Sequence, residues 1–308
     1  MALNADQHRL KEADHKALFE RVIIPCLFEN AQTMSRPVAI IFGGQPGSGK
    51  SAALELAERE LESRGGCIKI IGDELRDFHP EFRKLLQFDD KTAAFYTDRD
   101  TGQWVEKAIA HAKELRTNIV IEGTMRDSDK VAQTMQSLRA VGYEIDARAL
   151  AVNGMLSLQG ILQRYENQKA DRGIGRMTTP EAHEAAYDGM PITLERIELE
   201  KLADRITLYR RGGLAIYSNT LQEGAWAKEP QARAALVAER SRPLNPEELQ
   251  SYVQGYDRLV ELMARPGRGA TDKELTVVHT LRAQALALTG RVLGQQHPAK
   301  VVRPSMTP

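Results

Sequence analysis

A glycine-rich segment at residues 44–51, with the sequence GQPGSGKS, carries the clearest sign of chemistry in this chain. It matches the phosphate-binding pattern in which a glycine, four residues and a second glycine precede lysine and serine or threonine. Such glycines permit a left-handed backbone and a close approach of N–H groups to phosphate oxygens, and the helix that follows directs its positive end at them. The pattern predicts that Lys50 contacts the β and γ phosphates of ATP or GTP and that the Ser51 hydroxyl binds Mg²⁺. The predicted nucleotide-binding residues are Gly44, Gln45, Pro46, Gly47, Ser48, Gly49, Lys50 and Ser51.

The residues on both sides of this loop supply the elements that the pattern requires. Residues 38–42, VAIIF, form a continuous apolar run, which is typical of a strand covered on both faces in a parallel sheet. Residues 52–64 are compatible with a helix. A glycine-rich loop without a ligand is the alternative interpretation, but it gives the strand, the loop and the helix no reason to occur together. We therefore expect nucleotide binding.

Two carboxylates follow or end apolar strands of the expected fold. Residues 67–72, CIKIIG, predict a strand that ends directly before Asp73, and residues 118–123, NIVIEG, predict a strand that carries Glu122 near its end. Open α/β sheets bind ligands at the carboxyl ends of their strands. Carboxylates placed there can hold Mg²⁺ or accept a proton from a hydroxyl nucleophile. For Asp73 the alternative is a helix N-cap, and the two roles are compatible.

Arginines further along the chain could neutralise phosphate charge. Residues 155–170 predict a helix that carries Arg164, and residues 171–176, DRGIGR, form a glycine-punctuated basic loop that ends in Arg176. Loops of this composition in phosphate-transfer enzymes often close over the phosphates as a lid. A solvated surface charge is the alternative interpretation for each arginine. Residues 74–100 are polar and are broken at His79-Pro80, so we expect an irregular insertion over the site.

The order of the predicted elements indicates an α/β fold, with a P-loop kinase-like, mostly parallel sheet flanked by helices. Helical patterns alternate with strand patterns up to about residue 203, and residues 205–218 predict a β-hairpin. From Thr220 onward alanine, glutamate and arginine become more frequent, and residues 227–239 predict a helix. Two further helical patterns within residues 247–290 predict a C-terminal helical extension, the second with a capping box at Thr271 and Glu274. We expect a kinase-like domain at residues 1–224, a helical hairpin at 225–290 and a disordered tail at 291–308.

The composition is that of an ordinary soluble protein. The 42 basic residues balance 42 acidic ones, so nothing in the net charge favours nucleic acid or an anionic membrane as a partner. Cys26 and Cys67 are far apart among apolar neighbours, which fits reduced thiols better than a disulfide framework. No apolar run approaches the length of a membrane span, and the charged N-terminus lacks an apolar secretory segment. We expect a cytoplasmic protein.

Taken together, these motifs resemble, in type and order, those of the zeta toxin family, the toxin half of epsilon/zeta toxin–antitoxin systems. The segments that carry the resemblance are GQPGSGKS, IIGDELRDFHPEF, a helix with Glu106, NIVIEGTMR, LQRYE, GRMTTPEAHE and ITLYRRGGLAIYS. The resemblance implies a kinase that transfers the γ-phosphate of ATP to the 3′-hydroxyl of the amino sugar of UDP-N-acetylglucosamine and so blocks cell-wall precursor synthesis. It also implies a small helical antitoxin as partner.

The resemblance further implies a role for each motif residue. Asp73 matches the general base that accepts the sugar hydroxyl proton, and Lys50 and Ser51 match the loop lysine and the Mg²⁺-linked hydroxyl. Arg164 and Arg176 match the arginines that steady the transferring phosphate, a reaction that needs mainly alignment and charge neutralisation. The positions that match contacts to the nucleotide sugar, or that order the site, are Asp73, Glu106, Glu122 and Thr124. The region beyond about residue 224 has no counterpart in the minimal family core, so it could be an inhibitory segment in cis.

Other interpretations of the same motifs stay open. The chain could phosphorylate another UDP-sugar, a nucleoside or dinucleotide, or a polynucleotide end, because related kinases share the loop, the base and the lid. A non-catalytic nucleotide switch would leave Asp73, Arg164 and Arg176 without a role. A pure interaction module would leave the intact loop idle. The second strand also lacks an extra acidic residue that some family members carry two positions before the aspartate, so Mg²⁺ coordination could differ.

Overall fold

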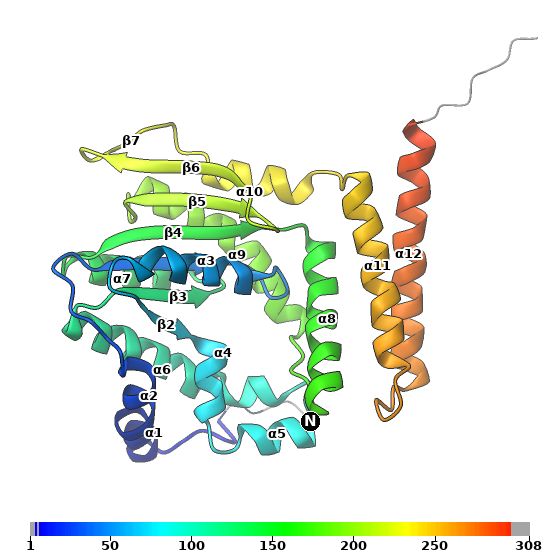
Figure 1. The fold of residues 1–308 in the computed structure, drawn as a ribbon, viewed down its shortest axis with the longest axis horizontal. Helices are drawn as coiled ribbons and strands as arrows, with labels where there is room; N and C mark the ends of the chain where they lie inside the picture. The colour runs from blue at the N-terminus through cyan, green and yellow to red at the C-terminus, as the bar shows by residue number, and fades with distance from the viewer. Residues whose placement is uncertain (1–3, 5, 297–308) are drawn as a thin grey trace, which may run out of the picture. The chain divides into compact units, whose positions relative to one another are not determined.

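A computed structural model describes residues 4 and 6–296 of the chain. The chain divides into two compact units, the first ending at Arg242 and the second beginning at Pro243. Figure 1 shows the first unit as a sheet flanked by helices and the second as a pair of long helices.

A seven-stranded sheet with the order β2-β3-β1-β4-β5-β6-β7 organises the first unit. Its strands are β1 (Val38–Gly43), β2 (Ile68–Ile71), β3 (Ile119–Gly123), β4 (Glu144–Ala151), β5 (Arg205–Arg210), β6 (Ala215–Gln222) and β7 (Ala225–Trp226). β1 runs parallel to both β3 and β4, with Ile41 opposite Ile121 on one side and Ala147 on the other. β2 is parallel to β3 and β4 to β5, whereas β6 is antiparallel to both β5 and β7. The predicted mostly parallel sheet and the predicted hairpin are confirmed.

Helices connect the parallel strands and cover both faces of the sheet, as Figure 1 shows. They are α1 (Glu12–Leu18), α2 (Ile24–Phe28), α3 (Lys50–Glu62), α4 (Gly72–Leu75), α5 (Phe82–Phe88), α6 (Ala93–Leu115), α7 (Ser128–Arg139), α8 (Gly154–Arg172), α9 (Pro180–Leu199) and α10 (Ala232–Ser241), with a π-helical turn at Phe19–Ile23 and a 3-10 turn at Arg76–Phe78. Parallel strands need such crossover connections, because their ends lie at opposite edges of the sheet. None of the described helices has the length and apolar character that a bilayer span requires.

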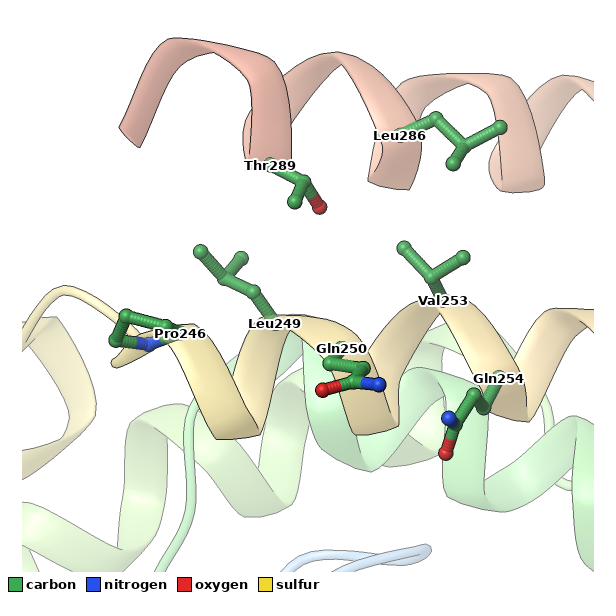
Figure 2. A pocket seen from close by; sticks show the side chains of 7 residues that line it. All are labelled: Pro246, Leu249, Gln250, Val253, Gln254, Leu286 and Thr289. Carbon is green, nitrogen blue, oxygen red and sulfur yellow. The ribbon is translucent and has the colours of Figure 1, made fainter. Parts of the chain in front are cut away.

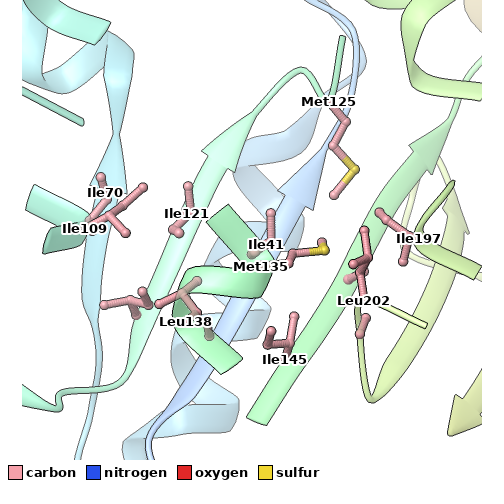
Figure 3. Close-up of a cluster of buried hydrophobic side chains, with 14 of the residues drawn as sticks. Ile41, Ile70, Ile109, Ile121, Met125, Met135, Leu138, Ile145, Ile197 and Leu202 are labelled. Carbon is pink, nitrogen blue, oxygen red and sulfur yellow. The ribbon is translucent and has the colours of Figure 1, made fainter. Parts of the chain in front are cut away.

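Alternate residues of the central strand β1 face two different cores. Ile41 belongs to the larger core, together with Met135 of α7 and Ile197 of α9. Figure 3 shows these side chains converging between the strands and the helices. Ile40 belongs to a second core, together with Leu54 of α3. Because successive side chains of a strand point to opposite faces, a strand covered on both faces must be apolar at every position.

Residues 74–100 are largely helical, so the expected irregular insertion is wrong. α4, the 3-10 turn, α5 and the start of α6 occupy most of the segment. A small core of its own is formed by Phe82, Leu85 and Ala93. Polar side chains are buried here as well, because the Arg76 guanidinium donates to the Ala94 oxygen at 2.6 Å and to the Thr97 hydroxyl at 2.8 Å. Helices with polar groups on their buried faces lack the apolar periodicity by which helices are recognised.

The second unit is a pair of helices, α11 (Pro246–Met263) and α12 (Asp272–Gln296), which confirms the two helical patterns. Asn245 caps α11 by accepting the N–H of Glu248, whose side chain accepts the Asn245 N–H in return. Thr271 and Glu274 make the same reciprocal bonds, as predicted, at the start of α12. Such bonds satisfy N–H groups that a helix start leaves without partners.

A cavity of about 480 Å³ lies between α11 and α12. Figure 2 shows that Leu249 and Val253 point from α11 toward α12. An ion pair between Arg282 and Asp257, with Nε and Oδ1 2.5 Å apart, joins the same two helices. The helical pair is thus held by both apolar and charged contacts.

Residues 225–242 belong with the sheet in the structure. Ala232 and Leu236 of α10 are fully buried in the larger core of the first unit. The domain boundaries after residues 224 and 290 stay predictions. α12 continues to Gln296, so residues 291–296 are helical where we expected a disordered tail, since no proline interrupts the chain before Pro298. The rest of the predicted tail, residues 297–308, lies outside the described residues.

Candidate active site

The phosphate loop runs from the end of β1 to the start of α3. Two of its glycines adopt a left-handed backbone, with φ of 75° at Gly47 and 88° at Gly49. α3 begins at Lys50, so the unpaired N–H groups of its first turn stand at the end of the loop. Ser51 is exposed at this helix start. The strand, the loop and the helix therefore follow one another as the phosphate-binding pattern requires.

The helix α8 packs directly on the loop. A β-carbon at Gly47 would lie 2.0 Å from the backbone oxygen of Ser157, and one at Gly160 would lie 2.2 Å from the backbone oxygen of Gly47. Side chains do not approach a backbone so closely, so both positions require glycine. Contact between two backbones thus fixes the distance between α8 and the loop.

Arg211, in the turn between β5 and β6, binds the same loop. Its Nε donates to the Ser48 oxygen at 3.3 Å, and its Nη2 donates to the backbone oxygens of Gly47 and, at 3.1 Å, Leu156. Burial lowers the pKa of Arg211. No carboxylate among the described residues forms an ion pair with this guanidinium. Arg211 therefore joins the loop to α8 through backbone oxygens alone.

Gln45 directs its side chain into the protein. The side chain is fully buried, and its Nε2 donates to the Val152 oxygen at 2.7 Å and to the Ser157 hydroxyl at 3.3 Å. A phosphate contact from Gln45 would therefore come from its backbone. The Ser48 hydroxyl is also buried and has no hydrogen-bond partner among the described residues.

Lys50 connects the loop to the carboxylates at the strand ends. Its Nζ donates to the Gly44 oxygen at 2.7 Å and lies 3.4 Å from Oε1 of Glu122 on β3. Burial lowers the pKa of Lys50, although the charges of Glu122 and Asp73 act in the opposite direction. The ammonium is thus placed where the loop, β3 and the Asp73 carboxylate meet.

Asp73 lies in the first turn of α4, directly beyond the end of β2, among arginines. Its Oδ2 accepts a hydrogen bond from Nη2 of Arg176, and its Oδ1 lies 4.0 Å from Nη2 of Arg76. Burial acts to raise the pKa of Asp73, but the charges of Arg176, Arg76 and Arg164 outweigh it and hold the pKa below its usual value. Asp73 is therefore ionised at neutral pH, as a general base must be.

Arg164 projects from α8 into the same charged group. Its Nη2 donates to the Thr178 hydroxyl at 2.6 Å, and its buried Nε has no partner among the described residues. Burial and the neighbouring charge of Arg176 lower the pKa of Arg164 to about 10. The guanidinium thus remains a cation at neutral pH, and it keeps a donor free for a further acceptor.

The basic loop after α8 is fastened to that helix and to the α5–α6 connection. The N–H of Arg176 donates to Oε1 of Gln168 at 2.8 Å, and the N–H of Met177 donates to the Asp90 oxygen at 3.2 Å. A β-carbon at Gly175 would lie 2.6 Å from the Tyr165 oxygen. These contacts hold the loop where the Arg176 side chain reaches Asp73.

Glu106 and Thr124 are the predicted site residues least involved in this cluster. Glu106 lies on α6 with its side chain 68% exposed and 3.9 Å from Nζ of Lys130. Thr124 follows β3 directly and is half-buried. The residues that the structure brings together are Lys50, Asp73, Glu122, Arg164 and Arg176. The roles assigned to all these residues stay predictions.

Arg76 and Arg211 were not among the predicted site residues. Arg76 is 5% exposed, and it faces both Asp73 and Asp98. Its position three residues after Asp73 in a helical turn is a local signal that could have been used. Arg211 stands in the RRGG turn and gives no such signal, because its partners are far away in the sequence. No group of three or more histidine, cysteine or acidic side chains among the described residues forms a metal site.

The fold and the site together define a P-loop protein with the groups that phosphoryl transfer requires. A strand, a phosphate loop and a helix N-terminus lie beside a lysine, an ionised aspartate and two arginines. These are the parts that bind a nucleotide, orient a hydroxyl and neutralise a transferring phosphate.

The zeta toxin family model matches residues 26–222 of the chain. Toxin zeta of Enterococcus hirae is 33% identical over 242 residues, which cover 77% of this chain and 82% of that protein. Toxin PezT of Streptococcus pneumoniae serotype 4 is 30% identical over 194 residues, which cover 63% of this chain and 76% of that protein. The chain belongs to the zeta toxin family and is thereby a kinase.

Solved structures agree with this assignment. The chain resembles a structure from the PezAT chromosomal toxin–antitoxin system of Streptococcus pneumoniae with a TM-score of 0.70 at 25% identity, covering 84% of this chain and 100% of that one. It also resembles a structure of AvrRxo1-ORF1:-ORF2 with ATP, with a TM-score of 0.53 at 12% identity and 90% of each chain covered. The second likeness shows the fold alone. The family match ends at residue 222, before β7 and α10.

Proposed function

We propose that this kinase transfers the γ-phosphate of ATP to the 3′-hydroxyl of the amino sugar of UDP-N-acetylglucosamine. The observation that carries the proposal is the Asp73 carboxylate, which lies ionised between Arg176 and the phosphate loop that carries Lys50. Membership of the zeta toxin family supports the choice of acceptor. The product would be withdrawn from cell-wall precursor synthesis.

In this proposal Asp73 orients the sugar hydroxyl and accepts its proton. The hydroxyl oxygen forms a bond to the γ-phosphorus as the bond from that phosphorus to the β–γ bridging oxygen breaks, so ADP leaves with the electron pair. Lys50 and the loop N–H groups hold the β and γ phosphates, and Arg164 and Arg176 neutralise charge on the transferring group. Ser51, exposed at the start of α3, would hold Mg²⁺, which when bound adds further charge neutralisation.

The ion pair between Asp73 and Arg176 has a consequence for this step. A carboxylate with a lowered pKa is a weak base, so it holds little of the proton until the new bond to phosphorus is well formed. Phosphoryl transfer passes through a loose transition state and needs the nucleophile mainly to be aligned. Asp73 would therefore act chiefly by orienting the hydroxyl, and Arg176 would fix the direction of the carboxylate.

We also propose an antitoxin partner for the chain. The support is the family and the PezAT toxin–antitoxin system from which the most similar solved structure of those above comes. The helical pair α11–α12 could instead inhibit the kinase in cis. A chain that ends at Arg242 separates the two possibilities, since it keeps the first compact unit and lacks the second.

The test of the acceptor is mass spectrometry of UDP-N-acetylglucosamine after incubation with ATP, Mg²⁺ and the full chain. We expect a product heavier by one phosphate, at a rate that falls at least about 1000-fold for Asp73→Asn. The neutral amide loses the ion pair with Arg176 that fixes the direction of the side chain toward the hydroxyl, and it cannot accept the proton. Asp77→Asn is the matched control, since Asp77 is exposed in the neighbouring turn. Phosphorylation of a different acceptor, such as another UDP-sugar or a dinucleotide, with no reaction at UDP-N-acetylglucosamine by either the full chain or the chain ending at Arg242, would overturn the proposal.

A further inference from the structure

The helix α10 lies beyond residue 222, where the match to the family model ends, yet one of its side chains reaches the phosphate loop. Arg240 is 5% exposed, and its Nη2 donates to Oε1 of Gln45 at 2.9 Å. Its Nη1 donates to the backbone oxygen of Tyr187 on α9 at 2.6 Å. One guanidinium therefore joins α9 and α10 to a residue of the loop, across 195 positions of sequence between Arg240 and Gln45.

The surroundings of Arg240 are unusual for a buried cation. No carboxylate among the described residues forms an ion pair with it, and its Nε has no hydrogen-bond partner there. The guanidinium lies over the Tyr187 ring, 4.0 Å from the ring centroid. Burial lowers the pKa of Arg240 to about 10, so it is still charged at neutral pH. The charge of Asp188 favours the cation without forming an ion pair with it, but burial outweighs this effect, so the guanidinium is costly to bury.

Arg240 completes a set of hydrogen bonds under the loop. Gln45 accepts from Arg240 and donates to the Ser157 hydroxyl at 3.3 Å, and the Ser157 hydroxyl lies 2.8 Å from Nε2 of His183. The His183 ring stacks on Tyr187, with the ring centroids 5.8 Å apart. The chain of contacts thus returns to the residue that Arg240 itself binds.

The same contacts determine where the loop backbone lies. The backbone oxygen of Ser157 is the atom that leaves no room for a side chain at Gly47. Gln45 is anchored on its other side by the Val152 oxygen at the end of β4. A shift of the Gln45 side chain would therefore move the loop against α8, where the backbones are already in contact.

We propose that Arg240 is a positioning residue for the phosphate loop, which acts through Gln45 and does not touch the nucleotide. The structural part of the nucleotide site then extends through α10, beyond the segment that the family model matches. Only the nucleotide-binding arm of the test below rests on the proposed function, because the position of the loop can be measured without nucleotide.

The first measurement is amide hydrogen exchange of residues 44–49 in the full chain without nucleotide. Arg240→Met keeps the approximate length of the side chain and removes its hydrogen-bond donors. We expect these amides to exchange with solvent about tenfold faster in this variant, because the loop loses a hydrogen bond from a charged donor, which is among the stronger kinds. Arg233→Met is the matched control on the same helix, since Arg233 is half-exposed and forms a surface ion pair with Glu195. We expect no change at residues 44–49 in the control.

The second measurement separates positioning from general stability. ATP affinity, measured by calorimetry, is expected to fall about tenfold in Arg240→Met and to recover partly in Arg240→Lys, which restores one donor. If Arg240 acts through Gln45, then Arg240→Met adds little to a Gln45→Ala variant, because two changes in one contact are not additive. Should Arg240→Met fail to fold, Arg240→Lys provides both the exchange and the affinity comparison.

Two results would overturn the proposal. One is that amide exchange at residues 44–49 is unchanged in Arg240→Met, or that it rises by the same factor throughout the first unit. Either outcome would mean that the loop does not depend specifically on Arg240. The other is full additivity of the Gln45 and Arg240 substitutions. If the wild-type chain bound no ATP, the proposed function would fail, and the exchange comparison would still decide the role of Arg240.

Discussion

The phosphate loop and the charged cluster beside it are held in place in different ways. The loop is fixed by hydrogen bonds to backbone oxygens and by the contact of Gly47 and Gly160 with facing backbone. The cluster is held by charge, with Asp73 paired with Arg176 and Lys50 near Glu122. The energy of a hydrogen bond or a steric contact changes steeply over a few tenths of an ångström, whereas the attraction between two charges weakens only slowly with distance. We infer that the loop positions the nucleotide by shape, while the cluster can adjust to an acceptor and keep its charge balance.

Removing a cation from the cluster should have a larger effect than a steric change at the loop. We expect Arg176→Met to lower kcat about 100-fold, because it removes a cation from the transferring phosphate. The same change should move the acid limb of kcat/KM to higher pH. A nearby cation favours the ionised carboxylate, so its removal raises the pKa of Asp73 and protonates the base at a higher pH than in the wild type. The measurement is the pH profile of kcat/KM for both chains.

Arg172→Met serves as the control for this prediction. Arg172 is exposed at the end of α8, at the start of the same basic loop. Its removal should leave kcat and the acid limb in place. An acid limb that did not move in Arg176→Met would mean that a group other than Asp73 limits the reaction at low pH.

A steric change at the loop should have a smaller effect of a different kind. In Gly160→Ala the new methyl group would meet the Gly47 oxygen, so we expect a loss of about 2 kcal/mol in the free energy of unfolding. The affinity for ATP should fall about tenfold, while the pH profile stays unchanged, because no charge is altered. Gly102→Ala is the matched control, since Gly102 is exposed within α6 and nothing lies within 4 Å of a β-carbon there. That change should stabilise the chain by up to about 1 kcal/mol, as measured by thermal unfolding.

The smallest effect should come from Glu106→Gln. Because the Glu106 side chain is 68% exposed and its pairing with Lys130 is long, the charge itself contributes little to stability. If Glu106 contacts the acceptor, KM for the acceptor should rise about threefold while ATP affinity stays constant. Glu114→Gln, exposed on the same helix, should change neither quantity. An unchanged acceptor KM would contradict the predicted contact between Glu106 and the acceptor.

Much of the fold follows from patterns that are visible in the sequence. β1, the loop and α3 are adjacent in the chain, so one continuous sequence pattern predicts all three elements. The start of α12 was predicted from Thr271 and Glu274 for the same reason. The helices within residues 74–100 were missed, because Arg76 and Thr97 are polar and yet buried. A polar side chain indicates exposure unless its partner is known, and here the partner lies 21 residues away.

The same distinction between local and distant partners separates the parts of the site that could be predicted from those that could not. The sequence by itself determined the phosphate loop and the strand-end carboxylates, because both depend on neighbouring residues and on the rule that ligands bind at the carboxyl ends of strands. Only the tertiary structure showed that Arg76 and Arg211 lie at the site and that the Arg176 side chain reaches Asp73. Arg176 lies 103 positions from Asp73, and Arg211 lies 164 positions from Gly47. A charged side chain has the same local appearance whether it is solvated or buried against a carbonyl, so its role is set by the packing that brings distant segments together.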